Sequence, residues 1–238
     1  MTKQTHLLTL GLLGVLASSA CGKTAADPGT VAFTGVTVLP MDRPGAVVDQ
    51  TVVTVGGVIT EVGPSNSVQV GTGATVIDGS GRYLMPGLAE MHAHVPSGAD
   101  LSREALEDIL FLYIANGITT IRGMLGSDYQ IPLADELEAS GVLGPNLYVG
   151  APSLNGNSAP TPDAAEALIR AHKAGGYDLQ KIHPGVPLDA WNRMVEVAAE
   201  VGFTYGGHVP ADVGLVHALE TGMSTVEHLD GYVQAVAS

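Results

Sequence analysis

The chain has little positive charge and almost no cysteine. Its 238 residues include 10 Lys and Arg against 24 Asp and Glu, which gives a formal net charge of -14. A chain with this balance lacks the cations that neutralise phosphates, so the sequence excludes a nucleic-acid partner. The one cysteine, Cys21, excludes a disulfide framework and every zinc or iron–sulfur site built on cysteine. A metal site in this chain would therefore use histidine, carboxylate or a less usual ligand.

The apolar run at the N-terminus is too short to span a bilayer. It covers residues 7–17, follows Lys3 and ends at Ser18-Ser19-Ala20, which is the pattern of a secretory signal peptide over residues 1–20. Cys21 comes directly after the small residues, where bacterial lipoprotein precursors are cut and acylated, although Ser18 stands where that pattern has leucine. We expect an exported cell-envelope lipoprotein that contacts the membrane only through an anchor at Cys21, with simple secretion to the periplasm or the exterior as the alternative.

After a polar tether at residues 21–30, the sequence predicts a small β domain at residues 31–81. The runs 31–39, 51–55, 58–62 and 74–78 are rich in β-branched residues and alternate. Gly56-Gly57 separates two of these runs and predicts a hairpin.

From residue 82 to residue 238, short apolar strands alternate with helical patterns, which is typical of βα units and a parallel sheet. We predict strands at residues 84–91, 118–122, 146–149, 179–182, 203–206 and 225–227. We predict helices at residues 102–115, 132–139, 163–174, 188–201 and 213–220, and no element after residue 230. Asp163 and Glu166 have the spacing of a capping box at the start of one helix.

The βα part is too short for a complete barrel. It has 157 residues and six predicted strands, whereas an eight-stranded (β/α) barrel needs about 250 residues. The predicted fold class is therefore α/β, a TIM-type barrel that is incomplete at six strands. We expect the chain to be a fragment of a longer protein.

Histidines and one lysine stand at the ends of these strands. His92 and His94 are two apart, so both imidazoles point to one side of a strand and could hold one ion. Lys181, His208 and His228 end the fourth, fifth and sixth strands. Because all strand ends of a parallel barrel open on the same face, these residues are expected to converge. On the residues alone, solvated strand-end side chains remain an alternative description.

Three segments together resemble the metal-dependent amidohydrolase superfamily, over residues 31–238. They are the run 78–88 followed by His-x-His, Gly-Gly-His-Val-Pro at residues 206–210, and Val-Glu-His-Leu at residues 226–229. The segment Asp-Leu-Gln-Lys-Ile at residues 178–182 is similar to the prolidase-like subgroup, in which a lysine on the fourth strand is carboxylated and bridges two metals.

The resemblance implies a barrel joined to a small β-sandwich domain, of which residues 31–81 are the N-terminal part. It also implies two divalent metal ions: His92 and His94 would hold one, His208 and His228 the other, and Lys181 would be shared after carboxylation by carbon dioxide. Zinc suits such nitrogen and oxygen ligands, with manganese or cobalt as alternatives.

The implied reaction is hydrolysis of an amide or peptide bond by metal-activated water, with a small molecule or a dipeptide, such as one ending in proline, as substrate. The superfamily places its acid–base residue, an aspartate, after the eighth strand, so no catalytic residue is assigned within this chain. Asp230, two residues after His228, is a poor replacement and is expected to be a polar neighbour of the ligands.

Two further residues are candidates for substrate contact. His183 shares the strand face of Lys181 and would touch substrate or a ligand, or would be a turn histidine before Pro184. Tyr232 is the other candidate, whereas His172 and His217 are expected to be solvated helix residues. Two other functions remain open: hydrolysis of a cyclic amide, as in imidazolonepropionase relatives, and a shortened, non-catalytic metal-binding or partner-binding protein of the envelope.

Overall fold

The computed structural model describes residues 25–96, 101–139 and 141–237. The predicted signal peptide and Cys21 lie outside the described residues. The chain divides into two compact units, with the boundary between Pro86 and Gly87. In the described ranges, no helix is both long enough and apolar enough to cross a membrane.

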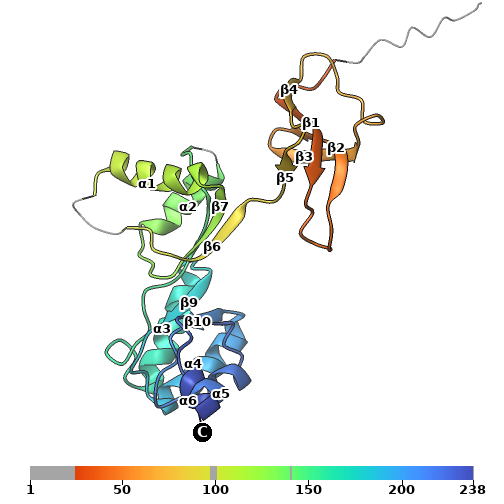
Figure 1. The fold of residues 1–238 in the computed structure, drawn as a ribbon. Coiled ribbons are helices and arrows are strands. Elements are labelled where there is room, and N and C mark those ends of the chain that lie inside the picture. The colour runs from red at the N-terminus through yellow and green to blue at the C-terminus, as the bar shows by residue number, and fades with distance from the viewer. Residues whose placement is uncertain (1–24, 97–100, 140, 238) are drawn as a thin grey trace, which may run out of the picture. The chain divides into compact units, whose positions relative to one another are not determined.

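The first unit is a five-stranded sheet in the order β3-β2-β1-β4, with β5 also paired to β1 (Figure 1). Its strands are β1 (Thr30–Val38), β2 (Val47–Val55), β3 (Val58–Pro64), β4 (Thr75–Asp78) and β5 (Tyr83–Leu84). The antiparallel pair β2 and β3 is the predicted hairpin, and Gly56 and Gly57 at its turn have φ angles of 56° and 83°. Two consecutive positive φ angles are what a tight hairpin turn requires, and glycine adopts them at no steric cost.

The sequence predicted one strand over residues 84–91, and this was wrong. Leu84 pairs with Val38 of β1 in the first unit, whereas a separate strand, β6 (Leu88–Ala93), begins the sheet of the second unit. The apolar run is continuous across Pro86, so hydrophobicity alone does not show the break. The first unit consequently extends to Pro86, beyond the predicted limit of residue 81.

In its described residues, the second unit contains six parallel strands and six helices, most of which are labelled in Figure 1. The other strands are β7 (Ile118–Gly123), β8 (Asn146–Val149), β9 (Leu179–Ile182), β10 (Thr204–Gly207) and β11 (Thr225–Val226). The helices are α1 (Arg103–Ala115), α2 (Gln130–Glu138), α3 (Pro162–Ala174), α4 (Leu188–Val201), α5 (Leu215–Glu220) and α6 (Tyr232–Ala237). The bounds of β8, β9 and α4 are those predicted from the sequence.

The six strands lie side by side in chain order. Strands β6, β7 and β8 form one parallel group, and β9, β10 and β11 form another. A parallel bridge between Gly150 and Leu179 joins the groups, with the Ala151 N–H donating to the Leu179 carbonyl over 2.7 Å. This order is the βα pattern predicted from the sequence and confirms the α/β class.

One hydrophobic core holds the second unit together. It includes Ile121, Ile182 and Trp191, each with no exposed surface. Helix α4 buries Ala190, Trp191, Met194 and Val197 at helical spacing, and Gly202 ends it in the left-handed conformation at φ 62° and ψ 50°. Glycine is the residue that tolerates this C-terminal position.

The predicted capping box at Asp163 was wrong. Thr161 is the N-terminal cap of α3, and its hydroxyl accepts a hydrogen bond from the Ala164 N–H at 3.3 Å. Glu166 instead pairs with Arg170 and with Arg193 of α4, so it joins two helices. Pro162 occupies the first helical turn, where its missing N–H costs nothing.

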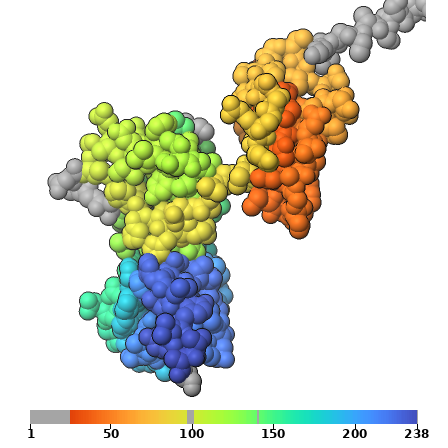
Figure 2. Space-filling model, viewed as in Figure 1, coloured from red at the N-terminus to blue at the C-terminus, as the bar shows by residue number. Residues whose placement is uncertain are grey.

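A short helix at the C-terminal end, α6, was not predicted from the sequence. Figure 2 shows this dark blue segment at the molecular surface, where Val233 and Val236 are 72% and 83% exposed. An apolar segment with no buried side chain lacks the periodic contrast from which helices are recognised.

Tyr177, which lies just before β9, should make stability fall at alkaline pH. Its buried phenol donates to the Asp128 carboxylate at 2.7 Å, and burial together with this bond raises the pKa of Tyr177 to about 12. A tyrosine in the unfolded chain has a pKa of about 10. The stabilisation is therefore complete below pH 10 and is lost as pH rises from about 10 to 12. Urea unfolding of the wild type and of Tyr177→Phe across this range should show a steeper loss in the wild type, and parallel curves would contradict the assignment.

Candidate metal centre

Five imidazoles form a continuous series at the ends of strands β6, β9, β10 and β11. In order along the series they are His94, His92, His228, His208 and His183. Neighbouring ring centroids are 5.2, 4.8, 4.8 and 5.0 Å apart. The ring of His92, on the first strand of the unit, thus contacts that of His228, which follows the last. The structure brings together every histidine that the sequence singled out for the site.

Two of these rings each contact a carboxylate through Nδ1. His92 Nδ1 lies 2.7 Å from Glu227 Oε2, and His208 Nδ1 lies 2.6 Å from Asp230 Oδ2. When a neutral imidazole donates its Nδ1–H to a carboxylate, the lone pair is on Nε2 and can bind a metal. Asp230 therefore lies beside His208, one of the candidate ligands.

One turn supplies both carboxylates. Glu227 and Asp230 flank His228 and Leu229, whose φ angles of 58° and 59° lie in the left-handed region. Residues other than glycine adopt this conformation at a cost of about 1 kcal/mol or more each. The turn places the His228 ring between those of His92 and His208 while its two acidic side chains reach one ring each.

Lys181 lies on β9 beside this series and is almost completely enclosed, with 1% of its surface exposed. Burial lowers the pKa of Lys181, and the nearby Arg122 charge adds to the effect, while Glu227 and Asp230 oppose it. The lysine charge in turn helps to lower the pKa of His94 and of His183, in both of which burial is the main cause. Lys181 is therefore electrostatically coupled to both ends of the imidazole series.

Glu227 and Arg122 are central to the site, and the sequence analysis assigned a role to neither. Arg122 Nη2 donates to Glu227 Oε1 at 2.8 Å, and Arg122 Nε donates to the Met91 carbonyl at 2.8 Å. Burial would raise the pKa of Glu227, but hydrogen bonds from His92 and Thr225 and the Arg122 charge lower it below its ordinary value. A charged residue at the end of the β-branched run 118–121, and another directly before a site histidine, were the signals that could have found them.

The two substrate-contact candidates have different surroundings. His183 Nδ1 lies 2.6 Å from the Ser153 hydroxyl, and its ring stacks on His208, so it belongs to the series. Tyr232 begins α6 and is 41% exposed. Among the described residues, it makes no ring contact with the five imidazoles.

The expectation of solvated helix histidines was wrong for His172 and His217. His172 Nδ1 lies 2.7 Å from the Gln180 side-chain oxygen, and its ring meets Tyr177 edge-on. His217 Nε2 lies 2.8 Å from the Asn192 oxygen. Both histidines are partly buried and connect elements of the second unit, away from the site.

Within the described ranges, no group of three or more His, Cys, Asp and Glu side chains converges as a metal site. The imidazoles instead form a series with nearly equal spacings, with Lys181 alongside. The ligand set inferred from the sequence needs only two imidazoles for each ion, because the modified lysine would complete both. The anchored Nδ1 atoms and the enclosed lysine fit that set.

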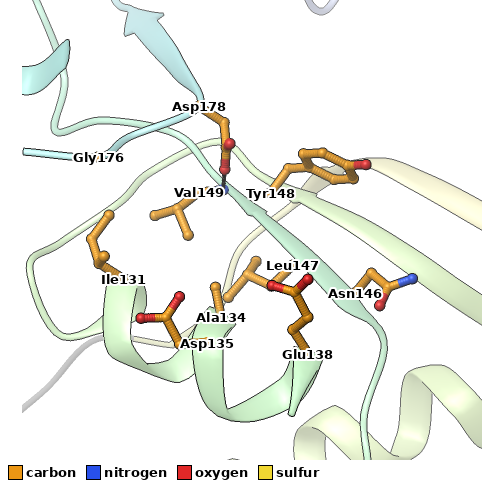
Figure 3. Close-up of a pocket in the computed structure, with 10 residues that line it drawn as sticks. All are labelled: Ile131, Ala134, Asp135, Glu138, Asn146, Leu147, Tyr148, Val149, Gly176 and Asp178. Carbon is orange, nitrogen blue, oxygen red and sulfur yellow. Dashed lines mark hydrogen bonds between the residues drawn. The ribbon is translucent and has the colours of Figure 1, made fainter. Parts of the chain in front are cut away.

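Pockets of the second unit include one that is separate from the imidazole series and one that adjoins it. The pocket in Figure 3, of about 470 Å³, lies between α2 and β8 and has Asp135, Glu138 and Asp178 on its wall. None of the site histidines lines it. A second pocket, of about 770 Å³, is lined by Pro184, Val209 and Asp230, which follow β9, β10 and β11. The second pocket adjoins the imidazole series through Asp230.

No family model matches the chain. The chain is 30% identical over 194 residues to adenine deaminase 3 of Rhizobium meliloti, and the match covers 73% of this chain and 31% of that protein. The chain thus spans about a third of the length of this curated relative.

Solved structures share the fold. A molinate hydrolase superimposes with a TM-score of 0.73 at 16% identity, over 86% of this chain and 58% of that one. A Xaa-Pro dipeptidase with bound methionine superimposes with a TM-score of 0.68 at 17% identity, over 84% and 61%. The chain has the α/β fold of amidohydrolase structures, and its relatives are hydrolases acting on carbon–nitrogen bonds.

Proposed function

We propose that this chain carries the metal centre of a metal-dependent hydrolase that cleaves a carbon–nitrogen bond. The observation that carries the proposal is the series of five imidazoles beside an enclosed lysine at the ends of parallel strands. The adenine deaminases among the sequence relatives and the hydrolase structures support the same class of reaction.

The ligands would be His92 and His94 for one ion and His208 and His228 for the other, with Lys181 shared. The enclosed Lys181 amine, when neutral, adds to carbon dioxide, forms an N–C bond and releases one proton, which leaves an anionic carbamate. When bound, the two ions would supply activated water near neutral pH and polarise the scissile bond. Glu227 and Asp230 hold the His92 and His208 rings, and His183 faces the same space for substrate contact.

The barrel proposal follows from the strand order. Six parallel strands lie in chain order, and side chains after the last reach those of the first. This supports the proposed TIM-type barrel, with the first unit as part of a small β-sandwich domain. Export and a lipid anchor at Cys21 remain part of the proposal on sequence alone.

Two substrate classes follow from different observations. The lysine segment at residues 178–182 favours a peptide bond, as in prolidase-like dipeptidases. The 30% identity over 194 residues favours the exocyclic amine of a purine, as in the adenine deaminase relative. Both substrates present a trigonal carbon bonded to nitrogen, so the same centre suits either.

Metal removal and a substrate screen test the proposal. Protein expressed from the complete gene and supplied in turn with zinc, manganese and cobalt should hydrolyse adenine, a cyclic amide or a dipeptide ending in proline. Product would be measured as ammonia, the ring-opened acid or free proline, respectively. Dialysis against a chelator should abolish this activity, and readdition of the metal should restore it. A protein that retains metal but hydrolyses none of these substrates would favour the non-catalytic envelope protein instead.

A further inference from the structure

We propose that Arg122 and Glu227 form a clamp that fixes the orientation and tautomer of His92. The consequence of the clamp for metal binding at Nε2 rests on the proposed function. The clamp itself is defined by contacts among the described side chains. Glu227 is the positioning residue, and Arg122 holds Glu227 in place.

Short hydrogen bonds join the side chains of the clamp. Glu227 uses Oε2 for His92 Nδ1 at 2.7 Å and Oε1 for Arg122 Nη2 at 2.8 Å, while the Thr225 hydroxyl donates to Oε1 at 3.0 Å. The side chains of Arg122 and Glu227 are only 11% and 12% exposed. With both carboxylate oxygens occupied, Glu227 has no freedom to rotate away from the ring.

Arg122 also holds the backbone of the strand that carries His92. Its Nε donates to the Met91 carbonyl at 2.8 Å, one residue before His92. The ring and the main chain of β6 are therefore both tied to the same ion pair, which comes from β7 and from the residue after β11. These contacts join positions 31, 105 and 135 residues apart.

The charge of Glu227 decides the tautomer. A carboxylate only accepts hydrogen bonds, so neutral His92 must carry its proton on Nδ1 and leave Nε2 as a lone pair. A glutamine at position 227 accepts from Arg122 through its oxygen and donates through its nitrogen to His92 Nδ1. The proton then moves to Nε2, where a metal must displace it in order to bind.

The test compares the wild type with Glu227→Gln. In metal-free protein with ¹⁵N-labelled histidine, above the histidine pKa, nitrogen chemical shifts of His92 should report the Nδ1–H form in the wild type and the Nε2–H form in the variant. Zinc affinity, measured by competition with a chelating dye, should fall about 10- to 100-fold. Glu200→Gln, which removes one carboxylate from the exposed pair with Arg170 on the helices, is the control and should change neither readout.

A second variant covers the case in which Glu227→Gln fails to fold. Arg122→Met releases one side of Glu227, so the His92 signal should become a mixture of tautomers. An unchanged Nδ1–H signal in either folded variant would overturn the clamp. If the wild type shows the Nδ1–H form and the variants lose it, while the wild type binds no zinc, the clamp stands and the proposed metal centre fails.

Discussion

Replacing Lys181 by alanine should lower the metal content from about two ions per chain to one or none, and should reduce hydrolysis by about 100-fold or more. The amine is 1% exposed and burial lowers its pKa, so its neutral form is accessible for modification. The shortened side chain cannot bridge two ions, and the imidazole pairs then lack a common ligand. Metal analysis of purified protein and a rate measurement would check both effects.

The matched control is Lys173→Ala on α3, where the ammonium lies 5.5 Å from the centre of the Phe203 ring and away from the site. This variant should keep its metal and its activity. Metal uptake by the wild type should also increase with added bicarbonate, and bicarbonate should have no effect on Lys181→Ala. Full metal content in Lys181→Ala would remove the bridge from the proposed centre.

Replacing Trp191 by alanine should destabilise the second unit by about 3–5 kcal/mol, the range for removing a large buried aromatic side chain. Trp191 has no exposed surface, meets Tyr205 edge-on with centroids 5.6 Å apart, and donates from Nε1 to the Thr221 hydroxyl at 3.2 Å. The cavity left behind borders β10, the strand that leads to His208. Urea unfolding followed by circular dichroism would measure the loss.

Leu188→Ala, on the same helix, provides the comparison because Leu188 is 44% exposed. It should cost well under half as much as Trp191→Ala, since exposed side chains lose little on truncation. Equal losses for the two variants would mean that α4 does not pack as described.

The bounds of an element could be predicted from the sequence where a single physical signal was enough to define them. Strands β8 and β9 are short segments with apolar residues, each placed between helical patterns, and α4 has a strong apolar face with a glycine at its end, so their bounds were predicted without error. The run 84–91 carried an apolar signal too, but the signal does not say which sheet each half joins. That division depends on the pairing of Leu84 with β1, which is a tertiary contact that the local sequence does not specify.

The convergence of the site histidines could be predicted from the sequence, but the partners of their rings could not. Strand ends of parallel units meet on one face, so spacing was enough to gather His92, His208 and His228. The partner of each ring depends on side-chain direction over long separations, such as the 135 residues between His92 and Glu227. At sequence level, Glu227 and Arg122 are ordinary charged residues, and only their low exposure reveals their roles.

The turn from Glu227 to Asp230 has a consequence for protein engineering. Because it serves rings on two different strands through a backbone with two left-handed residues, its length matters as much as its three site side chains. Leu229, which is 73% exposed, can be exchanged with only local effects. Adding or deleting one residue there would pull both anchoring carboxylates out of register at once, so design libraries should vary only Leu229 in this turn and keep the residue count constant.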